Sequence, residues 1–123
     1  SASLRGTAPA QARRFAIQVD CDTLHISQDV AVPVAFLVTE LVELAMLADP
    51  SASMWISART DPDREDRATL AVSSPALRES VIDDAHLHDR FSRVLTGLSR
   101  QLRSPLDHDG ETGRYSIAIT VIP

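Results

Sequence analysis

Residues 26–46 read ISQDVAVPVAFLVTELVELAM, and this stretch does most to decide the fold. Its apolar residues recur at helical spacing, and Pro33 stands near its start, where a missing N–H costs a helix little. Asp29 is a plausible N-cap and Asp49 begins a stop signal, so we predict a helix between them. We expect one broad face of this helix to form half of the core, through Phe36, Leu37, Leu41, Leu44, Ala45 and Ala48.

Segments in which apolar and polar residues alternate predict strands on both sides of this helix. These segments are residues 14–20, 23–27, 54–59, 68–73 and 115–122. In the first of them, Phe15, Ile17 and Val19 are expected to share one face.

A second amphipathic helix is predicted near the end of the chain, over residues 86–102. Its apolar positions are Leu87, Phe91, Val94, Leu95, Leu98 and Leu102. Residues 60–67 are expected to form a charged hairpin connection, residues 74–85 an irregular segment, and residues 107–113 a turn-rich loop.

The order of these elements predicts an α/β (α+β) two-layer sandwich, in which a mixed β-sheet carries helices on one face. The 123 residues suit one domain, which we place at residues 14–123, after a linker or arm over residues 1–13. The single cysteine, Cys21, cannot form an internal disulfide, and no signal peptide is visible. We therefore expect a cytoplasmic location.

The net charge of −5 argues against binding to nucleic acid or to an anionic membrane surface, both of which favour basic proteins. The longest apolar stretch, residues 30–48, is interrupted by Pro33, Glu40 and Glu43. We therefore expect this domain to make no membrane contact.

The predicted first helix carries a resemblance to a known family. Residues 31–34 and 39–45 match the segment AVPLGLIVNELVTNALKHA of the histidine kinases common in alphaproteobacteria, with changes in the second part. The chain thus resembles the ATPase-like domain of a bacterial sensor histidine kinase, over about residues 14–123. The resemblance implies the Bergerat (GHKL) fold, which DNA gyrase also has, and three nucleotide-binding motifs.

The first motif implied by the resemblance is a Glu and an Asn four residues apart, on one helix face. The Glu polarises the attacking group or water, and the Asn binds Mg²⁺. Glu40 is retained here as a vestigial catalytic residue, but the Asn position holds Leu44. Leucine has no oxygen to offer, and Mg²⁺ requires oxygen ligands.

The second motif is an adenine site, Asp-x-Gly-x-Gly, in which the Asp accepts the adenine amino group. Ser74 stands at the Asp position, and Ala76 and Arg78 stand at the glycine positions. The carboxylate is therefore lost, and Arg78 places bulk where the backbone has to approach a ligand.

The third motif is a glycine-rich phosphate lid before the second helix, where backbone N–H groups cradle phosphate. Residues 89–92, which begin with Asp89, occupy this position and contain no glycine. The carboxylate of Asp89 would repel a triphosphate.

Three losses at three separated motifs predict that this domain has lost ATP and Mg²⁺ binding, so that no cofactor is expected. The resemblance then implies a degenerate C-terminal domain of a two-component phosphorelay protein, of the histidine phosphotransferase or phosphatase type. Its expected partners are a response-regulator receiver domain and an upstream helical dimerisation domain of the same polypeptide. The isolated domain is expected to be inactive. Two alternatives stay open: an active ATP-binding kinase domain and a free-standing protein-interaction domain.

Two further groups of side chains bear on partners and metals. Arg90, Arg93 and Arg100 of the second helix could steer the acidic phosphorylation pocket of a receiver domain. His86 and His88 form a His-x-His sequence among acidic residues, but on a helix two such residues do not face one way. We therefore predict neither a metal site nor a phospho-accepting histidine.

Overall fold

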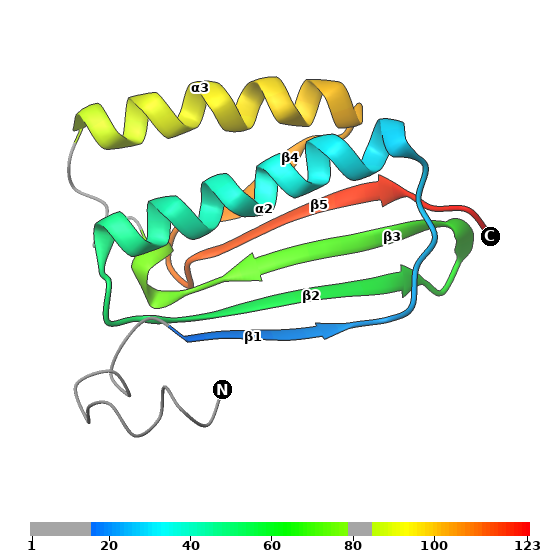
Figure 1. Cartoon of the computed structure of the whole chain (residues 1–123), viewed down its shortest axis with the longest axis horizontal. Coiled ribbons are helices and arrows are strands. Elements are labelled where there is room, and N and C mark those ends of the chain that lie inside the picture. Colours follow the sequence, from blue (N-terminus) through cyan, green and yellow to red (C-terminus); the bar gives the residue numbers. More distant parts are fainter. Residues whose placement is uncertain (1–15, 79–84) are drawn as a thin grey trace, which may run out of the picture.

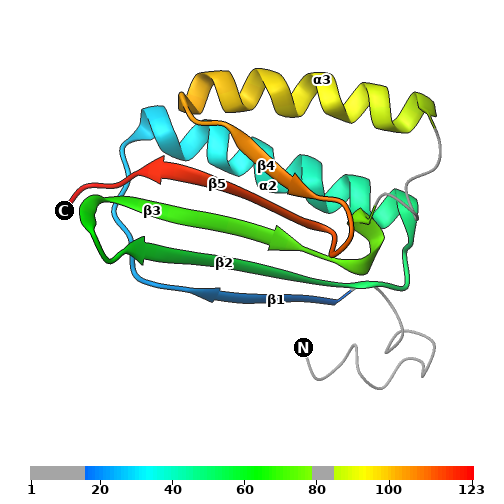
Figure 2. The ribbon, with the colours of Figure 1, turned by 180° about the vertical axis from the view of Figure 1, so that it is seen from behind.

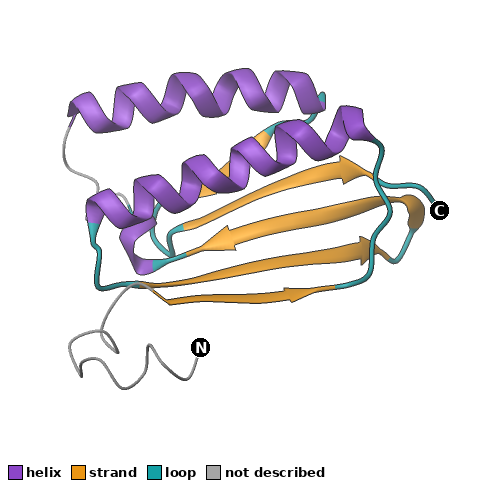
Figure 3. Ribbon diagram, in the orientation of Figure 1, coloured by secondary structure: helices purple, strands orange, loops and turns teal. Residues whose placement is uncertain are grey.

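The computed structural model describes residues 16–78 and 85–123, without the side chains of residues 85–88. Five strands form one mixed sheet, and two long helices lie on one of its faces (Figures 1 and 3). Figure 2 shows the same two layers from behind. This architecture confirms the predicted two-layer sandwich with helices on one face.

The elements are β1 (Ala16–Cys21), α2 (Gln28–Ala48), β2 (Ser53–Asp61), β3 (Arg64–Ser73), the 3₁₀ turn η2 (Pro75–Leu77), α3 (Ala85–Leu102), β4 (Leu106–Asp109) and β5 (Arg114–Thr120). The strand order across the sheet is β1-β2-β3-β5-β4. The pairing of β1 with β2 is parallel, whereas β2–β3, β3–β5 and β4–β5 are antiparallel. The parallel pair is joined by α2, since parallel neighbours need a long crossover connection.

Helix α2 supplies the centre of the core. Leu37, Leu41 and Leu44 are each no more than 2% exposed and pack in one cluster with residues of the sheet and of α3. The N-cap is Ser27 rather than the predicted Asp29, which lies in the first turn, while the helix ends before Asp49 as predicted. The inclusion of Phe36 in the core face was wrong, because its side chain is 57% exposed.

By length and composition alone, α2 could cross a membrane, with a mean hydropathy of 2.1 over its most apolar window. This corrects the expectation that Pro33, Glu40 and Glu43 interrupt residues 30–48 too often for them to span a membrane. In the folded chain the helix lies along the sheet, and one side of it is buried there (Figure 1). The opposite side exposes Val32, Phe36, Met46 and Leu47.

Helix α3 packs beside α2 and covers the other part of the sheet. Phe91, Leu95, Leu98 and Leu102 are buried as predicted, whereas Val94 is 39% exposed and lies outside the core face. Leu87 falls among the side chains that are not described.

Two parts of the predicted element order were wrong. Residues 23–27 form no strand; the carbonyl of His25 accepts a hydrogen bond from the N–H of Ile122 (2.7 Å). Conversely, the segment predicted as a turn-rich loop begins with the edge strand β4. The hairpin β2–β3 was predicted correctly, but its strands run through most of the charged connection and leave a turn at Pro62 and Asp63.

In β1, Ile17 and Val19 share a face as expected, but that face is not buried. Ile17 is 45% exposed and Val19 is 66% exposed, although both stand opposite core-side positions of β2 in the pairing register. The first strand therefore contributes little to the core. Phe15 and the proposed linker lie outside the described residues.

Helix α3 ends at an unusual residue, which gives a first testable prediction. Arg103 has φ of +55° and its N–H donates to the carbonyl of Arg100 (3.1 Å), while the N–H of Ser104 donates to Ser99 (3.2 Å). This left-handed position at a helix end favours glycine.

We expect Arg103→Gly to raise the free energy of unfolding by about 0.5–1 kcal/mol, measured by urea denaturation. Arg100→Gly, inside the last turn, should instead lower it by about 1 kcal/mol; equal effects of the two variants would contradict this account.

Candidate functional site

The residues that occupy the three predicted motifs lie at one end of the molecule. The C-terminal half of α2 carries Glu40 and Leu44, and α2 contacts both η2 and α3. Ser74 directly precedes η2, and Asp89 lies in the first part of α3. Figure 1 shows these segments together, at the end where α2 finishes and α3 begins.

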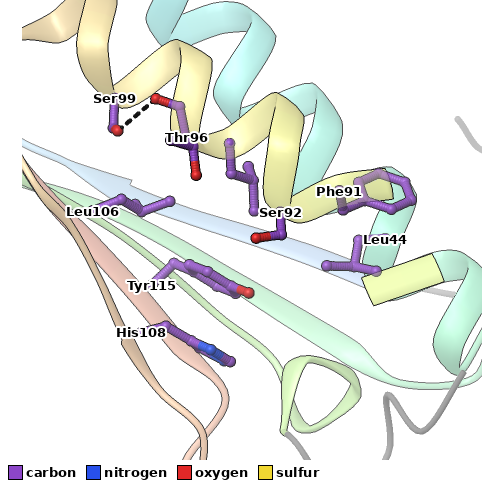
Figure 4. A pocket seen from close by; sticks show the side chains of 9 residues that line it. Leu44, Phe91, Ser92, Thr96, Ser99, Leu106, His108 and Tyr115 are labelled. Atoms are coloured by element: carbon purple, nitrogen blue, oxygen red, sulfur yellow. Dashed lines mark hydrogen bonds between the residues drawn. The ribbon is translucent and has the colours of Figure 1, made fainter. Parts of the chain in front are cut away.

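Leu44 lines a cavity between α3 and the β4–β5 edge of the sheet (Figure 4). The cavity has a volume of about 230 Å³, and the Leu44 side chain is 2% exposed. Glu40 lies one turn earlier on α2 and is half-buried. An apolar side chain therefore occupies the place at which the resemblance expects a magnesium ligand.

Ser74 is 1% exposed, and all of its polar groups have partners within the chain. Its Oγ accepts a hydrogen bond from the N–H of Ala76 (3.1 Å) and so caps η2. Its N–H donates to the carbonyl of Gly113 (2.9 Å), and its own carbonyl accepts from the N–H of Leu77 (3.0 Å). The hydroxyl at the position that the resemblance assigns to adenine binding therefore serves the local fold.

The turn between β4 and β5 packs against this segment through Gly113. Gly113 has φ of +75°, and a Cβ placed on it would lie 2.1 Å from the carbonyl oxygen of Ser74. The same turn is closed by Asp109, whose carboxylate accepts hydrogen bonds from the N–H groups of Glu111 (3.0 Å) and Thr112 (3.4 Å). These two hydrogen bonds hold the pKa of Asp109 below its ordinary value. Sequence reasoning missed Gly113 because its role depends on a segment 39 residues away.

The residues matched to the remaining glycine positions differ in their surroundings. Ala76 is fully buried. Arg78 is exposed, and its Nε donates to the carbonyl of Pro75 (3.1 Å). Asp89 is exposed at the start of α3.

The arginines of α3 lie on its exposed side. The guanidinium of Arg90 is 3.5 Å from the carboxylate of Glu43 and 5.1 Å from the centre of the Phe91 ring, so it links α3 to α2. Arg93 and Arg100 are exposed. Their guanidinium groups are therefore available to a partner, whereas that of Arg90 is already paired and only partly available.

His108 is a second residue whose place sequence reasoning missed. Its ring stacks on Tyr115, with 4.0 Å between ring centres and an interplanar angle of 4°. Its Nε2 lies 3.0 Å from the carbonyl oxygen of Leu77, which requires that this nitrogen carries the proton and donates. The histidine thus fastens β4 to η2, and the stacked pair forms one wall of the cavity.

These residues do not fit MgATP. The cavity is smaller than the about 300–1,000 Å³ typical of small-molecule sites, and its described lining contains no Asp, Glu, Lys or Arg. Leu44 offers no oxygen for a metal, and the hydroxyl of Ser74 already accepts a hydrogen bond. Within the described residues, no three His, Cys, Asp or Glu side chains lie close enough to hold a metal ion. His86 and His88 lie outside the described side chains, as do their acidic neighbours at 83 and 84.

Comparison with known proteins gives similarity at the level of structure. No protein-family model and no curated protein sequence matches the chain. The blue-light activated histidine kinase EL346 of Erythrobacter litoralis superposes with a TM-score of 0.68 at 19% identity, covering 85% of this chain and 37% of that protein. The mycobacterial sensor histidine kinase MprB gives a TM-score of 0.55 at 14% identity, covering 93% of this chain and 88% of that one. The catalytic domain of the histidine kinase ThkA gives 0.54 at 11% identity, with 92% and 82% covered.

The chain spans about a third to a half of the two Erythrobacter structures that it matches, 37% of one and 54% of the other. It spans most of the isolated ThkA catalytic domain. The expectation drawn from residues 26–46 is therefore confirmed for the fold. The chain has the ATPase-type fold of histidine kinase catalytic domains.

Proposed function

We propose that this chain is a degenerate domain of a two-component signalling protein that keeps the histidine kinase ATPase fold without binding ATP. The observation that carries the proposal is the use of two motif positions by the fold itself. Leu44 is buried in the core cluster, and Ser74 caps η2. Restoring a nucleotide site would require both of these structural contacts to be given up.

In this proposal residues 14–123 form the C-terminal domain of a histidine phosphotransferase or phosphatase. The phosphoryl group would move between a histidine of an upstream helical dimerisation domain and an aspartate of a response-regulator receiver domain. The role of the present domain is to support that hairpin and to help hold the receiver. Such a protein works in the cytoplasm.

Titration with ATP and Mg²⁺ tests the central point. We expect isothermal calorimetry, or displacement of a fluorescent nucleotide, to show no saturable binding at millimolar ATP. The reason is that no described residue of the cavity offers a carboxylate or amide oxygen for Mg²⁺ or a positive charge for the phosphates. A dissociation constant in the micromolar range would support an active ATP-binding kinase domain and contradict the proposal.

The second candidate function is an active kinase domain with unusual ligands. It is favoured by the retention of Glu40 and by the similar structures, which are histidine kinases. Transfer of phosphate from ATP to a histidine in the full-length protein would establish it. A domain that binds a regulator without any dimerisation partner would point instead to a free-standing interaction module.

A charge reversal on α3 tests the proposed receiver contact. The double variant Arg93→Glu with Arg100→Glu, in the full-length protein, is expected to slow phosphotransfer to the cognate regulator several-fold at low salt. Electrostatic steering acts on the rate of encounter, so the difference should shrink at moderate salt.

The matched control is Arg64→Glu with Arg114→Glu, which changes the charge equally but on strands of the sheet. This variant should transfer phosphate at the parental rate. Equal rates for both double variants and the parent, at both salt concentrations, would remove α3 from the docking surface.

A further inference from the structure

The cavity between α3 and the β4–β5 edge persists although the motifs around it no longer suit a nucleotide. It has a volume of about 230 Å³ and is partly open to solvent. Its described lining comprises Leu44, Phe91, Ser92, Leu95, Thr96, Ser99, Leu106, His108 and Tyr115. Figure 4 shows these side chains on both sides of one space, with α3 on one side and the strands on the other.

The walls of the cavity differ in chemistry. Leu44, Leu95 and Leu106 provide apolar surface. The stacked rings of His108 and Tyr115 provide an aromatic wall opposite α3. Pairs of aromatic rings attract a further ring by stacking or edge-to-face contact, each worth about 0.5–1.5 kcal/mol beyond burial.

A row of hydroxyl groups runs along the side of α3 that lines the cavity. Ser92, Thr96 and Ser99 are spaced four and three residues apart, which places them on one helix face. The Oγ of Ser99 donates to the carbonyl of Thr96 (2.8 Å). Figure 4 shows the side chains of Ser92 and Thr96 directed toward the strands, where they can exchange hydrogen bonds with a bound molecule.

Size and charge limit what the cavity can hold. In another protein, an engineered apolar cavity of about 150 Å³ binds benzene, so 230 Å³ admits one or two fused rings. No Lys or Arg is present among the described lining residues to neutralise an anion. A phosphate or carboxylate would therefore give up part of its hydration without an opposite charge to replace it.

We propose that this cavity binds a small uncharged aromatic molecule, of the size of phenol or indole, with its ring between the leucines and Tyr115 and its polar group at the hydroxyl row. The proposal goes beyond the signalling role and does not depend on it. It gives the altered domain a ligand site of a different chemical class from the nucleotide site of its fold.

The test is a titration of the ¹⁵N-labelled chain with phenol and with indole, followed by two-dimensional NMR. We expect saturable shifts of the amide signals of Ser92, Thr96 and Tyr115, with dissociation constants on the order of 0.1–1 mM for ligands of this size. Benzoate, which has a similar ring and a negative charge, should bind at least about tenfold more weakly.

Two variants inside the cavity and one outside it locate the site. Ser92→Phe should fill the space and abolish the shifts, while Thr96→Val, which keeps the shape and removes a hydroxyl, should weaken phenol several-fold. Arg93→Ala, on the exposed side of the same helix, should bind as the parent does. Absence of saturable shifts with both probes, or equal binding by the parent and Thr96→Val together with shifts mapping elsewhere, would overturn the proposal. If Ser92→Phe does not fold, the comparison of Thr96→Val with Arg93→Ala decides it.

Discussion

Leu44→Asn is expected to lower the free energy of unfolding by about 3–5 kcal/mol. Leu44 is 2% exposed within the core cluster, and burial of a leucine side chain contributes roughly 1.5–3 kcal/mol. The amide that replaces it has to leave water, which adds about 1–3 kcal/mol when no partner is present. Urea denaturation followed by circular dichroism measures the difference.

Leu47→Asn is the matched control, since it makes the same chemical change one turn further along α2. The side chain of Leu47 is 54% exposed, so this variant should unfold within about 0.5 kcal/mol of the parent. If Leu44→Asn were as stable as Leu47→Asn, the asparagine would be solvated in an open pocket. The nucleotide site would then be intact in shape, which would count against the proposal that this domain has lost ATP binding.

Gly113→Ala is expected to be the second strongly destabilising change. An alanine at φ of +75° is strained by about 1–3 kcal/mol. Its Cβ would also lie 2.1 Å from the backbone oxygen of Ser74 and 3.0 Å from the nitrogen of Arg78, so backbone has to move. We expect a total loss of at least about 3 kcal/mol, together with changes in the NMR signals of residues 74–78.

Gly97→Ala provides the opposite result in the same chain. Gly97 lies within α3, and a Cβ placed on it meets nothing within 4 Å. Alanine is favoured over glycine inside a helix by about 0.5–1 kcal/mol, so this variant should be more stable than the parent. Similar losses for both glycine variants would show that the contact between Gly113 and Ser74 is not what the substitution breaks.

The helices were the most predictable part of this fold because their signals are local. The spacing of Leu37, Leu41 and Leu44 repeats every three or four residues, and the positions that recur in this way are the ones buried on the sheet. The exposed Phe36 shows the limit of that reasoning. A helix face is assigned by period, but how wide a sector the neighbouring layer covers depends on tertiary packing.

The strands that were misassigned depend on distant partners. Residues 23–27 alternate as a strand does, yet the pairing of β1 with β2 ends at Cys21 and Ala58. The carbonyl of His25 accepts instead from the N–H of Ile122, beyond the end of β5. Strand β4 has the composition of a turn, and it exists because His108 stacks on Tyr115 and because its backbone pairs with β5. Neither condition can be read from residues 106–109 alone.

The candidate site, like the fold, could be predicted from the sequence only in part. The match to known motifs predicts that Leu44 and Ser74 replace the magnesium and adenine ligands, and this stays a prediction. The structural use of these positions could not, because it depends on Gly113 and on the packing of α2 against the sheet. The cavity itself, with its hydroxyl row and its stacked rings, combines residues from α2, α3, β4 and β5.

The parallel pair β1–β2 has a consequence for the order in which the chain assembles. Ala16 pairs with Ser53, and all of α2 lies between them in the sequence, whereas β2 and β3 are joined by a short turn. Contacts between distant residues cost more loop entropy and form later in folding than local ones. β1 is also an edge strand, held on one side by β2, and all six of its residues are exposed. We therefore expect β1 to join the sheet late and to detach early. Mechanical tension that reaches the domain through the preceding residues would then act first on a strand held by one neighbour.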